Sequence, residues 1–301
     1  MIPRRSLLKQ AFVATTAVAG WTGSGGGPGG WGREARAAEA PGDVGSKDTF
    51  RLGMAGYTFH KFKLDPTLEM LRQVDVHHLC IKDFHLPLTS TDAEIAAFHE
   101  KCRSFGVTGY GVGPIYMGSE EEVDRAFEYT RRVGVKLLVG VPFKRVEQKR
   151  VASADLLKLI DRKVREFDIR YAIHNHGPDM PELFPSAASG LEMIAGMDRR
   201  VGLCLDIGHE FRDGKDPVRA VLDHADRIHD IHLKNVTAPN KSGRGAELPR
   251  GAIDLVAFAR ALRKVGYQGV CGLEYEKDMD KPMLGIAESI GYFRGVMDAT
   301  R

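Results

Sequence analysis

Four apolar, β-rich segments in the second half of the chain each end in a residue that can bind a metal ion or move a proton. The segments are residues 171–176 (YAIHNH), 202–209 (GLCLDIGH), 228–234 (IHDIHLK) and 269–276 (GVCGLEYE). In a closed barrel of parallel strands, the carboxyl ends of all strands meet at one face, where they build a single site. We therefore predict a metal-centred pocket that is assembled from four residues far apart in the sequence: His174, Asp206, His232 and Glu274.

The rest of the chain carries the alternation of strands and helices that such a barrel requires. Further strands are predicted at residues 51–59, 77–84, 107–117 and 135–143. Amphipathic helices are predicted at residues 91–105, 119–133 and 254–265, with Ser119 and Asp254 as N-caps and with Gly106, Gly134 and Gly266 at the ends. No G-x-G-x-x-G fingerprint follows any strand, which disfavours an open doubly wound sheet. We predict an α/β fold, a (β/α)8 TIM barrel that forms one domain over residues 48–299.

The N-terminus has the character of an export signal. Arg4 and Arg5 precede a short apolar stretch at residues 11–20, a Gly-rich run, and a small-residue cleavage pattern at residues 35–37. This order resembles a twin-arginine signal peptide, although a disordered basic N-terminus would have similar features. We assign residues 1–40 to the signal and linker, and we expect an exported, periplasmic or extracytoplasmic protein without a stable membrane anchor after cleavage.

The composition narrows the classes of partner. The formal net charge is only +3, and the charged residues of both signs are mixed along the chain, so a nucleic-acid partner is not expected. Three of the four cysteines, Cys80, Cys204 and Cys271, fall inside predicted strands. Buried free thiols are common in strands, so no disulfide is expected.

The four predicted ligands have the chemistry of a divalent metal site. Two imidazoles and two carboxylates, without a thiolate, suit Mn²⁺, Zn²⁺ or Co²⁺. Mg²⁺ is also possible but prefers oxygen ligands. A single histidine at a strand end is more often a hydrogen-bonded structural residue. Here, however, six of the eleven histidines fall at or just past predicted strand ends, together with Asp206 and Glu274. The joint placement favours one bound divalent ion.

Three motifs resemble a known family. They are Asp206-Ile-Gly-His209, Ile231-His-Leu-Lys-Asn235 and Leu273-Glu-Tyr-Glu276. They are similar to the signatures of strands six, seven and eight of the xylose isomerase-like TIM barrels, the sugar phosphate isomerases and epimerases. The resemblance covers residues from about 50 to 297. It implies metal ligands from strands five to eight, and a substrate pocket lined by His176, His209 and Lys234.

One position departs from the pattern of that family. His174 stands where the family commonly has a glutamate that serves as ligand and base. This leaves Glu274 as the one matched carboxylate of the usual pair, and a metal-bound imidazole is a poor base. A reaction with one strong base and an electrophilic metal is therefore favoured over a symmetrical two-base epimerisation. In this interpretation Glu274 takes the proton, and His176 or Lys82 stabilises or reprotonates the intermediate.

Further residues at predicted strand ends have two possible roles. Lys82 and His85 follow the second strand and could bind a substrate oxygen, but Lys82 could instead form an ion pair with Asp83 at the barrel rim. Arg244, in the polar loop after the seventh strand, could cover the substrate or belong to a solvated loop. Aromatic residues near other strand ends could form a wall against a sugar ring or belong to the core: Tyr57, Phe59, Tyr116 and Phe143.

These features favour an enzyme that acts on a small carbohydrate by removing a proton next to a carbonyl. A metal-dependent isomerase or epimerase is the leading hypothesis. A metal-dependent lyase or hydratase on 3-keto-glycosides and a non-catalytic sugar-binding barrel are the alternatives. A nuclease of the endonuclease IV type is disfavoured, because it requires more metal ligands and a basic groove.

Overall fold

The computed structural model describes residues 50–301, and the predicted signal segment at residues 1–40 lies outside the described residues. Eight parallel strands close into a barrel in the order β1, β2, β3, β4, β6, β7, β8, β11, with β11 paired to β1. Their bounds are β1 Arg51–Ala55, β2 His78–Ile81, β3 Thr108–Met117, β4 Leu137–Val146, β6 Arg170–His174, β7 Val201–Asp206, β8 Ile228–Leu233 and β11 Val270–Leu273. The predicted (β/α)8 barrel is confirmed.

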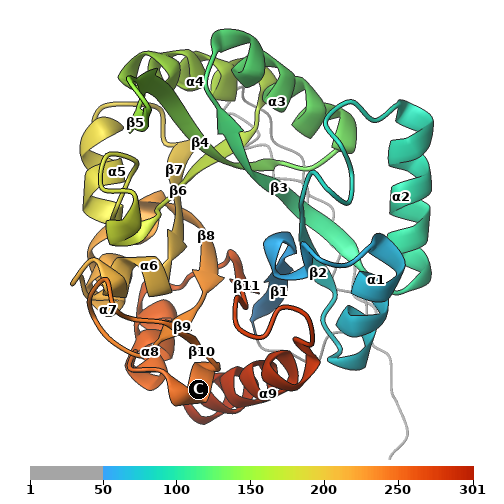
Figure 1. Ribbon diagram of the computed structural model, residues 1–301, viewed down its shortest axis with the longest axis vertical. Coiled ribbons are helices and arrows are strands. Elements are labelled where there is room, and N and C mark those ends of the chain that lie inside the picture. The colour runs from blue at the N-terminus through green and yellow to red at the C-terminus, as the bar shows by residue number, and fades with distance from the viewer. Residues whose placement is uncertain (1–49) are drawn as a thin grey trace, which may run out of the picture. The chain divides into compact units, whose positions relative to one another are not determined.

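Helices follow the strands and surround the barrel (Figure 1). They are α1 Leu64–Gln73, α2 Asp92–Ser104, α3 Glu120–Val133, α4 Ala154–Phe167, α5 Ala187–Met193, α6 Ile207–Arg212, α7 Pro217–His224, α8 Leu255–Val265 and α9 Met283–Ala299. None of the helices in residues 50–301 combines the length and the apolar character that crossing a membrane requires.

The predicted helix boundaries are confirmed by their caps. The Ser119 side chain accepts a hydrogen bond from the Glu122 amide at the start of α3, and Asp254 accepts one from Ala257 at the start of α8. Gly134 and Gly266 end these helices in the left-handed conformation, with φ of 77° and 65°. These local signals work because capping depends on neighbouring residues alone.

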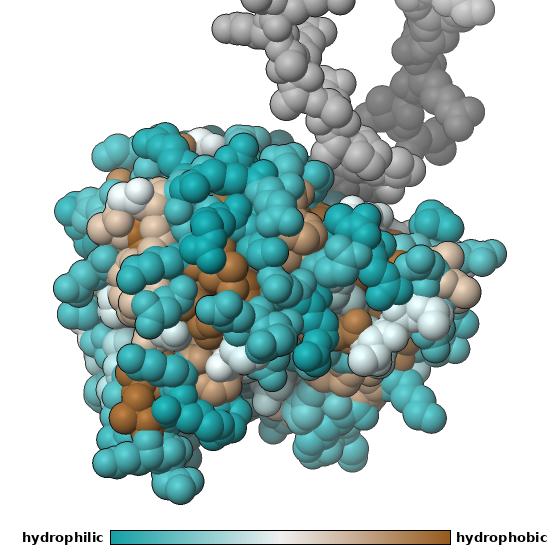
Figure 2. All heavy atoms as spheres, turned by 90° about the horizontal axis from the view of Figure 1, so that it is seen from above, coloured by the Kyte–Doolittle hydropathy of each residue, from teal (hydrophilic) through white to brown (hydrophobic). Residues whose placement is uncertain are grey.

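The core has two layers. The main apolar cluster joins the outward faces of the strands to the inward faces of the helices. A second, small cluster fills the inside of the barrel with compact side chains: Cys80, Leu137, Val139, Ala172 and Cys204, packed against Tyr110. All four cysteines are buried free thiols. Figure 2 shows that one outer face is mostly hydrophilic, with apolar side chains only in small separate patches.

Some predicted strands are shorter than expected, and two antiparallel strand pairs were not predicted. The first strand ends at Ala55 and continues as a 3-10 turn at Gly56–Phe59. The predicted strand 202–209 ends at Asp206, which caps α6, because its side chain accepts the amide hydrogen of His209 at 2.8 Å. A short strand β5, Lys149–Ala152, pairs antiparallel with the end of β4. Two further short strands pair after β8: β9 Asn235–Val236 and β10 Gly245–Ala246.

Candidate functional site

The four predicted ligands meet at the carboxyl ends of four neighbouring strands. His174 and Asp206 are the last residues of β6 and β7, His232 lies one residue before the end of β8, and Glu274 directly follows β11. All four side chains are at most 4% exposed. One ligand atom from each lies within 4.8 Å of the others. The barrel topology therefore brings together residues that are up to 100 positions apart, as the sequence predicted.

The distances within this cluster suit one divalent ion. Nε2 of His174 lies 3.1 Å from Nδ1 of His232. It also lies 3.8 Å from Oδ2 of Asp206 and 3.8 Å from Oε2 of Glu274. Ligands at the usual zinc bond lengths of about 2.0–2.1 Å are about 3.3 Å apart around a tetrahedral ion. In addition, Oδ2 of Asp206 is buried and has no well-aligned hydrogen bond from residues 50–301. The donor set and its spacing fit a metal ion.

The ammonium of Lys234 lies beside the two carboxylate ligands. Its Nζ atom is 3.0 Å from Oδ2 of Asp206, 2.9 Å from Oε2 of Glu274 and 3.1 Å from Oε2 of Glu276. Lys234 reaches this position by crossing Gly208 in α6, where a Cβ atom would lie 2.6 Å from its Cγ. This contact explains the glycine in the Asp206-Ile-Gly-His209 motif: a larger residue would displace the lysine.

The buried charges shift the pKa values of the site. Burial raises the pKa of Glu274, but Lys234 and His232 outweigh burial and hold this pKa well below its usual range. Burial raises the pKa of Asp206 to about 6, with Lys234 acting in the opposite direction. Burial lowers the pKa of Lys234, but Asp206, Glu274 and Glu276 outweigh it and hold this pKa well above its usual range. At neutral pH the cluster therefore holds ionised carboxylates next to a charged ammonium.

His176 and His209 lie on the mouth side of the ligands. The rings of His174 and His176 are 4.9 Å apart, and those of His176 and His209 stack at 6.2 Å. Nε2 of His176 shares a hydrogen bond of 2.6 Å with the Tyr116 hydroxyl, and burial lowers the pKa of His176 to about 3. Nε2 of His209 lies 3.4 Å from Nζ of Lys234. The structure thus places His176, His209 and Lys234 around the predicted metal ligands.

A polar layer that the sequence did not reveal lies beneath His232. Oδ2 of Asp230 is 3.7 Å from Nε2 of His232 and 3.3 Å from the Tyr110 hydroxyl, which donates to it. Asp230 is fully buried. The 3.7 Å separation is longer than a hydrogen bond, so Asp230 places a buried carboxyl group behind the imidazole without a direct bond to it. The sequence does contain one signal for this polar layer. Asp230 and His232 are two residues apart on one strand, so their side chains point to the same side.

A second buried carboxylate supports the strands from outside the cluster. Glu210, 3% exposed, accepts hydrogen bonds from the amide of Ala187 at 2.6 Å and from the Asn175 side chain at 3.5 Å. The Asn175 oxygen accepts the amide hydrogen of Asp206 at 2.8 Å. Burial raises the pKa of Glu210 to about 7. Glu210 and Asn175 therefore fix the end of β7 that carries a predicted ligand.

Three predicted site residues have their contacts elsewhere. Lys82 forms a short ion pair with the adjacent Asp83, the alternative that the sequence had left open. Nε2 of His85 lies 2.9 Å from the Phe62 carbonyl and 3.2 Å from the Thr67 hydroxyl. The exposed Arg244 uses its backbone to pair with Thr237. No contact within residues 50–301 joins any of the three to the ligand cluster.

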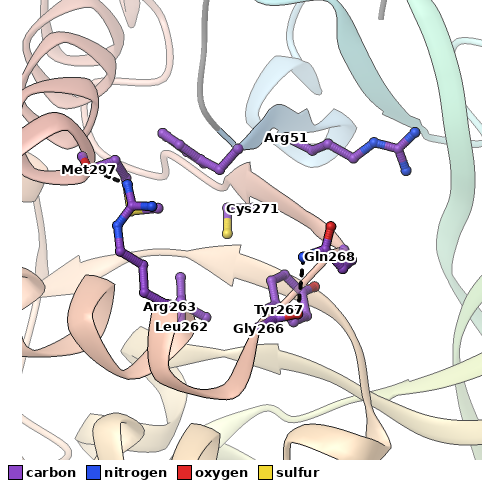
Figure 3. A pocket seen from close by; sticks show the side chains of 10 residues that line it. Arg51, Leu262, Arg263, Gly266, Tyr267, Gln268, Cys271 and Met297 are labelled. Carbon is purple, nitrogen blue, oxygen red and sulfur yellow. Dashed lines mark hydrogen bonds between the residues drawn. The ribbon is translucent and has the colours of Figure 1, made fainter. Parts of the chain in front are cut away.

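One surface hollow lies at the opposite end of the barrel. It is lined by residues at the start of β1 and β11 and at the end of α8, among them Arg51, Arg263, Tyr267 and Cys271 (Figure 3). These are the amino ends of the strands, where TIM barrels place residues for stability rather than for chemistry. The hollow is therefore separate from the ligand cluster.

Comparisons with known proteins agree with this geometry. A family model described as "Xylose isomerase-like TIM barrel" matches residues 58–296. The rhizopine catabolism protein MocC of Rhizobium meliloti is 30% identical over 138 residues, which are 40% of this chain and 42% of that relative. The chain thus matches less than half the length of that relative.

Solved structures share the fold. The IOLI protein with a bound zinc atom superimposes with a TM-score of 0.67 at 18% identity, over 84% of this chain and 99% of that one. An L-ribulose 3-epimerase gives a TM-score of 0.64 at 17% identity, over 84% of this chain and 96% of that one. At such identities the likeness concerns the fold alone.

Proposed function

The chain belongs to the xylose isomerase-like TIM barrel family, and we propose that it is a metal-dependent carbohydrate isomerase or epimerase that removes a proton next to a carbonyl. One observation carries this proposal: His174, Asp206, His232 and Glu274 converge, buried, at the carboxyl end of the barrel. Perturbed, buried ionisable groups at this end of a TIM barrel are typical of a catalytic site.

The four residues would hold a single divalent ion, Mn²⁺, Zn²⁺, Co²⁺ or Mg²⁺. Such an ion, when bound, polarises a carbonyl and an adjacent hydroxyl and so lowers the cost of removing the proton between them. The structurally similar IOLI protein is described with a bound zinc atom, which supports metal binding by a barrel of this fold. The identity of the ion in this chain is part of the proposal.

Glu274 is the best candidate for the base. Its pKa lies well below the usual range, because Lys234 and His232 outweigh burial, so it is ionised at neutral pH. Asp206 is less suited, because its Oδ1 atom accepts the His209 amide and its side chain caps α6. Lys234 holds the Glu274 carboxylate in place at 2.9 Å.

His176 is the proposed partner for returning the proton or stabilising the developing charge. Its ring lies next to His174, and its Nε2 atom is hydrogen-bonded to the Tyr116 hydroxyl. A neutral imidazole and a phenol can donate hydrogen bonds to a substrate oxygen. His209 and Lys234 would bind further oxygens of the substrate. Lys82, which pairs with Asp83, is a weaker candidate for this role than the sequence had suggested.

The single carboxylate base also supports a second function. With His174 in place of a second carboxylate base, the site has one carboxylate, Glu274, that can take a proton. Elimination next to a carbonyl, as in a lyase or hydratase on 3-keto-glycosides, requires one base and an electrophilic metal. The proposed substrate in either case is a small carbohydrate, and the predicted export signal at residues 1–40 makes a periplasmic substrate part of the proposal.

The test combines metal analysis with exchange in D2O. The purified protein is expected to hold about one divalent ion per chain, a content that His232→Ala should largely abolish. Proton NMR in D2O, with a panel of free sugars and 3-keto-glycosides, should reveal exchange at a carbon next to a carbonyl. Glu274→Gln should reduce the exchange rate by about 10²–10⁴-fold. New ketose or epimer signals would indicate an isomerase, and a double bond or released aglycone would indicate a lyase.

Two results would reject the proposal. One is full metal content in His232→Ala, because a missing ligand cannot be replaced without moving a strand. The other is a Glu274→Gln protein that binds metal normally and exchanges at nearly the wild-type rate. Metal content and exchange must therefore be measured on the same sample.

A further inference from the structure

The β4–β5 hairpin carries two arginines directly opposite each other. The register pairs Arg145 of β4 with Arg150 of β5. Side chains that face each other across an antiparallel pair lie on the same side of the sheet, so these two guanidiniums share one face. Like charges in this arrangement are destabilising unless a negative charge lies between or beside them. No acidic residue among residues 50–301 forms an ion pair with either of them.

Aromatic rings hold both guanidiniums in place. The Cζ atom of Arg150 lies 5.0 Å from the centre of the Tyr116 ring and 4.9 Å from that of Phe143. The Cζ atom of Arg145 lies 5.8 Å from the Phe143 ring. Cation–π contacts of this kind fix the guanidinium planes while their N–H groups stay free to donate. The arginines themselves are exposed, so they can bind a ligand from solvent.

The other face of the hairpin has a different environment. Lys149, whose partner in the register is Val146, pairs with Glu182 at 2.7 Å. Lys144 also points to that side, because it neighbours Arg145 along the strand. The unpaired positive charge is therefore concentrated on the face with Tyr116 and Phe143.

A short chain of contacts leads from this face to the ligand cluster. Arg150 covers the ring of Tyr116, the Tyr116 hydroxyl is bonded to His176 at 2.6 Å, and the His176 ring lies 4.9 Å from the His174 ring. Arg150 and Glu274 both influence the pKa of Tyr116, which burial raises. Arg150 is thus linked to the predicted metal ligands through Tyr116 and His176, and Arg145 lies beside it on the same face of the hairpin.

We propose that Arg145 and Arg150 bind an anionic group, a carboxylate or a phosphate, at the end of the sugar that is distant from the reacting carbon. Two fixed guanidinium forks match the planar or tetrahedral oxygens of such a group. The substrate is then an acidic sugar rather than a neutral one. This inference rests on the proposed function for the position of the sugar, while the anion site itself is defined by the hairpin.

Three sugars that differ only at carbon 6 test the proposal: D-glucose, D-glucuronate and D-glucose 6-phosphate. Calorimetric titration of the metal-loaded protein measures their binding without turnover. At least one of the charged sugars should bind about tenfold or more tightly than D-glucose, because hydrogen bonds between charged groups are strong. The sugar that shows the preference tells whether the group is a carboxylate or a phosphate.

Matched variants identify the residues. Arg150→Gln and Arg145→Gln should each lose most of the preference for the charged sugar and leave the binding of D-glucose unchanged. Arg150→Lys should keep part of it, because the charge remains but the fork is lost. Lys144→Gln is the control: it removes the same charge from the opposite face of the same hairpin and should retain the full preference.

Each of three outcomes would overturn the inference. They are equal binding of charged and neutral sugars, no measurable binding of either charged sugar, and a preference for the charged sugar that survives in Arg150→Gln. These outcomes are distinct from a failure of the proposed function. Exchange in D2O on a neutral sugar, without a preference for charged sugars, would support the proposed function and reject the anion site. A preference for a charged sugar without exchange on any sugar would support the anion site and reject the proposed function.

Discussion

Lys234→Met should destabilise the metal-free protein strongly and the metal-loaded protein much less. The wild-type ammonium lies 2.9–3.1 Å from the carboxylates of Asp206, Glu274 and Glu276, and the side chain is only 5% exposed. Methionine fills a similar volume without the charge. In the absence of metal, the substitution leaves the three carboxylates without the ammonium that contacts all of them.

The magnitude follows from the burial of the network. Removing one partner of a buried ion pair costs about 3–5 kcal/mol, because the remaining charge is desolvated and unpaired. In a domain of this size, 1 kcal/mol shifts Tm by about 2–4 °C, so Tm should fall by about 10 °C. A divalent ion that contacts Asp206 and Glu274 restores a positive charge at the same two carboxylates. With metal bound, the loss should be less than half as large.

Thermal and urea unfolding at pH 7.5, in EDTA and in saturating Mn²⁺, measure the two losses. The control is Lys136→Met, which removes a lysine from the exposed pair with Asp168. An exposed pair contributes at most about 1 kcal/mol, so this variant should change little in either condition.

An equal loss for Lys234→Met in EDTA and in Mn²⁺ would refute the reasoning, because the lysine and the metal would then not act on the same carboxylates. No loss in EDTA would also refute it, because the three contacts would then not stabilise the fold.

Three further predictions follow from single positions. His174→Glu should retain the metal, measured by metal analysis, because a carboxylate can replace the imidazole as a ligand; a metal-free variant would remove residue 174 from the ligand set. Glu210→Gln should stabilise the protein by about 3 kcal/mol at pH 8 and not at pH 4.5. The reason is that burial raises the pKa of Glu210 from 4.5 to about 7 in the folded protein, so the wild type loses stability as the pH rises between these two values. Urea unfolding at both pH values measures the difference, and an equal change at pH 4.5 and pH 8 would contradict the prediction. Replacing Arg4 and Arg5 with lysine should leave the precursor in the cytoplasm, as cell fractionation would detect; normal export would indicate another route.

Periodicity and strand-end chemistry were sufficient to predict the barrel and the four candidate ligands. The alternation of strands and helices is a local property of the chain, and the caps Ser119 and Asp254 act on residues within one turn. The candidate ligands could be recognised because every strand of a parallel barrel ends at the same face. His174, Asp206, His232 and Glu274 therefore had to be neighbours once the barrel closed.

The roles of the cations could not be predicted in the same way. Lys82 and Lys234 both follow a strand end, yet only Lys234 contacts the carboxylates. Lys234 reaches the carboxylates because it lies on the same side of its strand as His232 and because Gly208 leaves room for its side chain. Lys82 has an aspartate next to it and pairs there. Both outcomes depend on which atoms lie close to each lysine side chain in the folded protein. The local sequence pattern does not contain these distances.

The sequence by itself therefore determined the fold and the set of candidate ligands, since both follow from short-range propensities and from the common direction of the strands. Only the tertiary structure decided what surrounds them. Asp230 came to lie behind the His232 ring through packing inside the barrel. Arg145 and Arg150 became neighbours through the register of a hairpin that the sequence did not reveal. Long-range contacts of this kind are fixed by the closure of the barrel and the pairing of its strands, because these set the distances between residues that are remote along the chain.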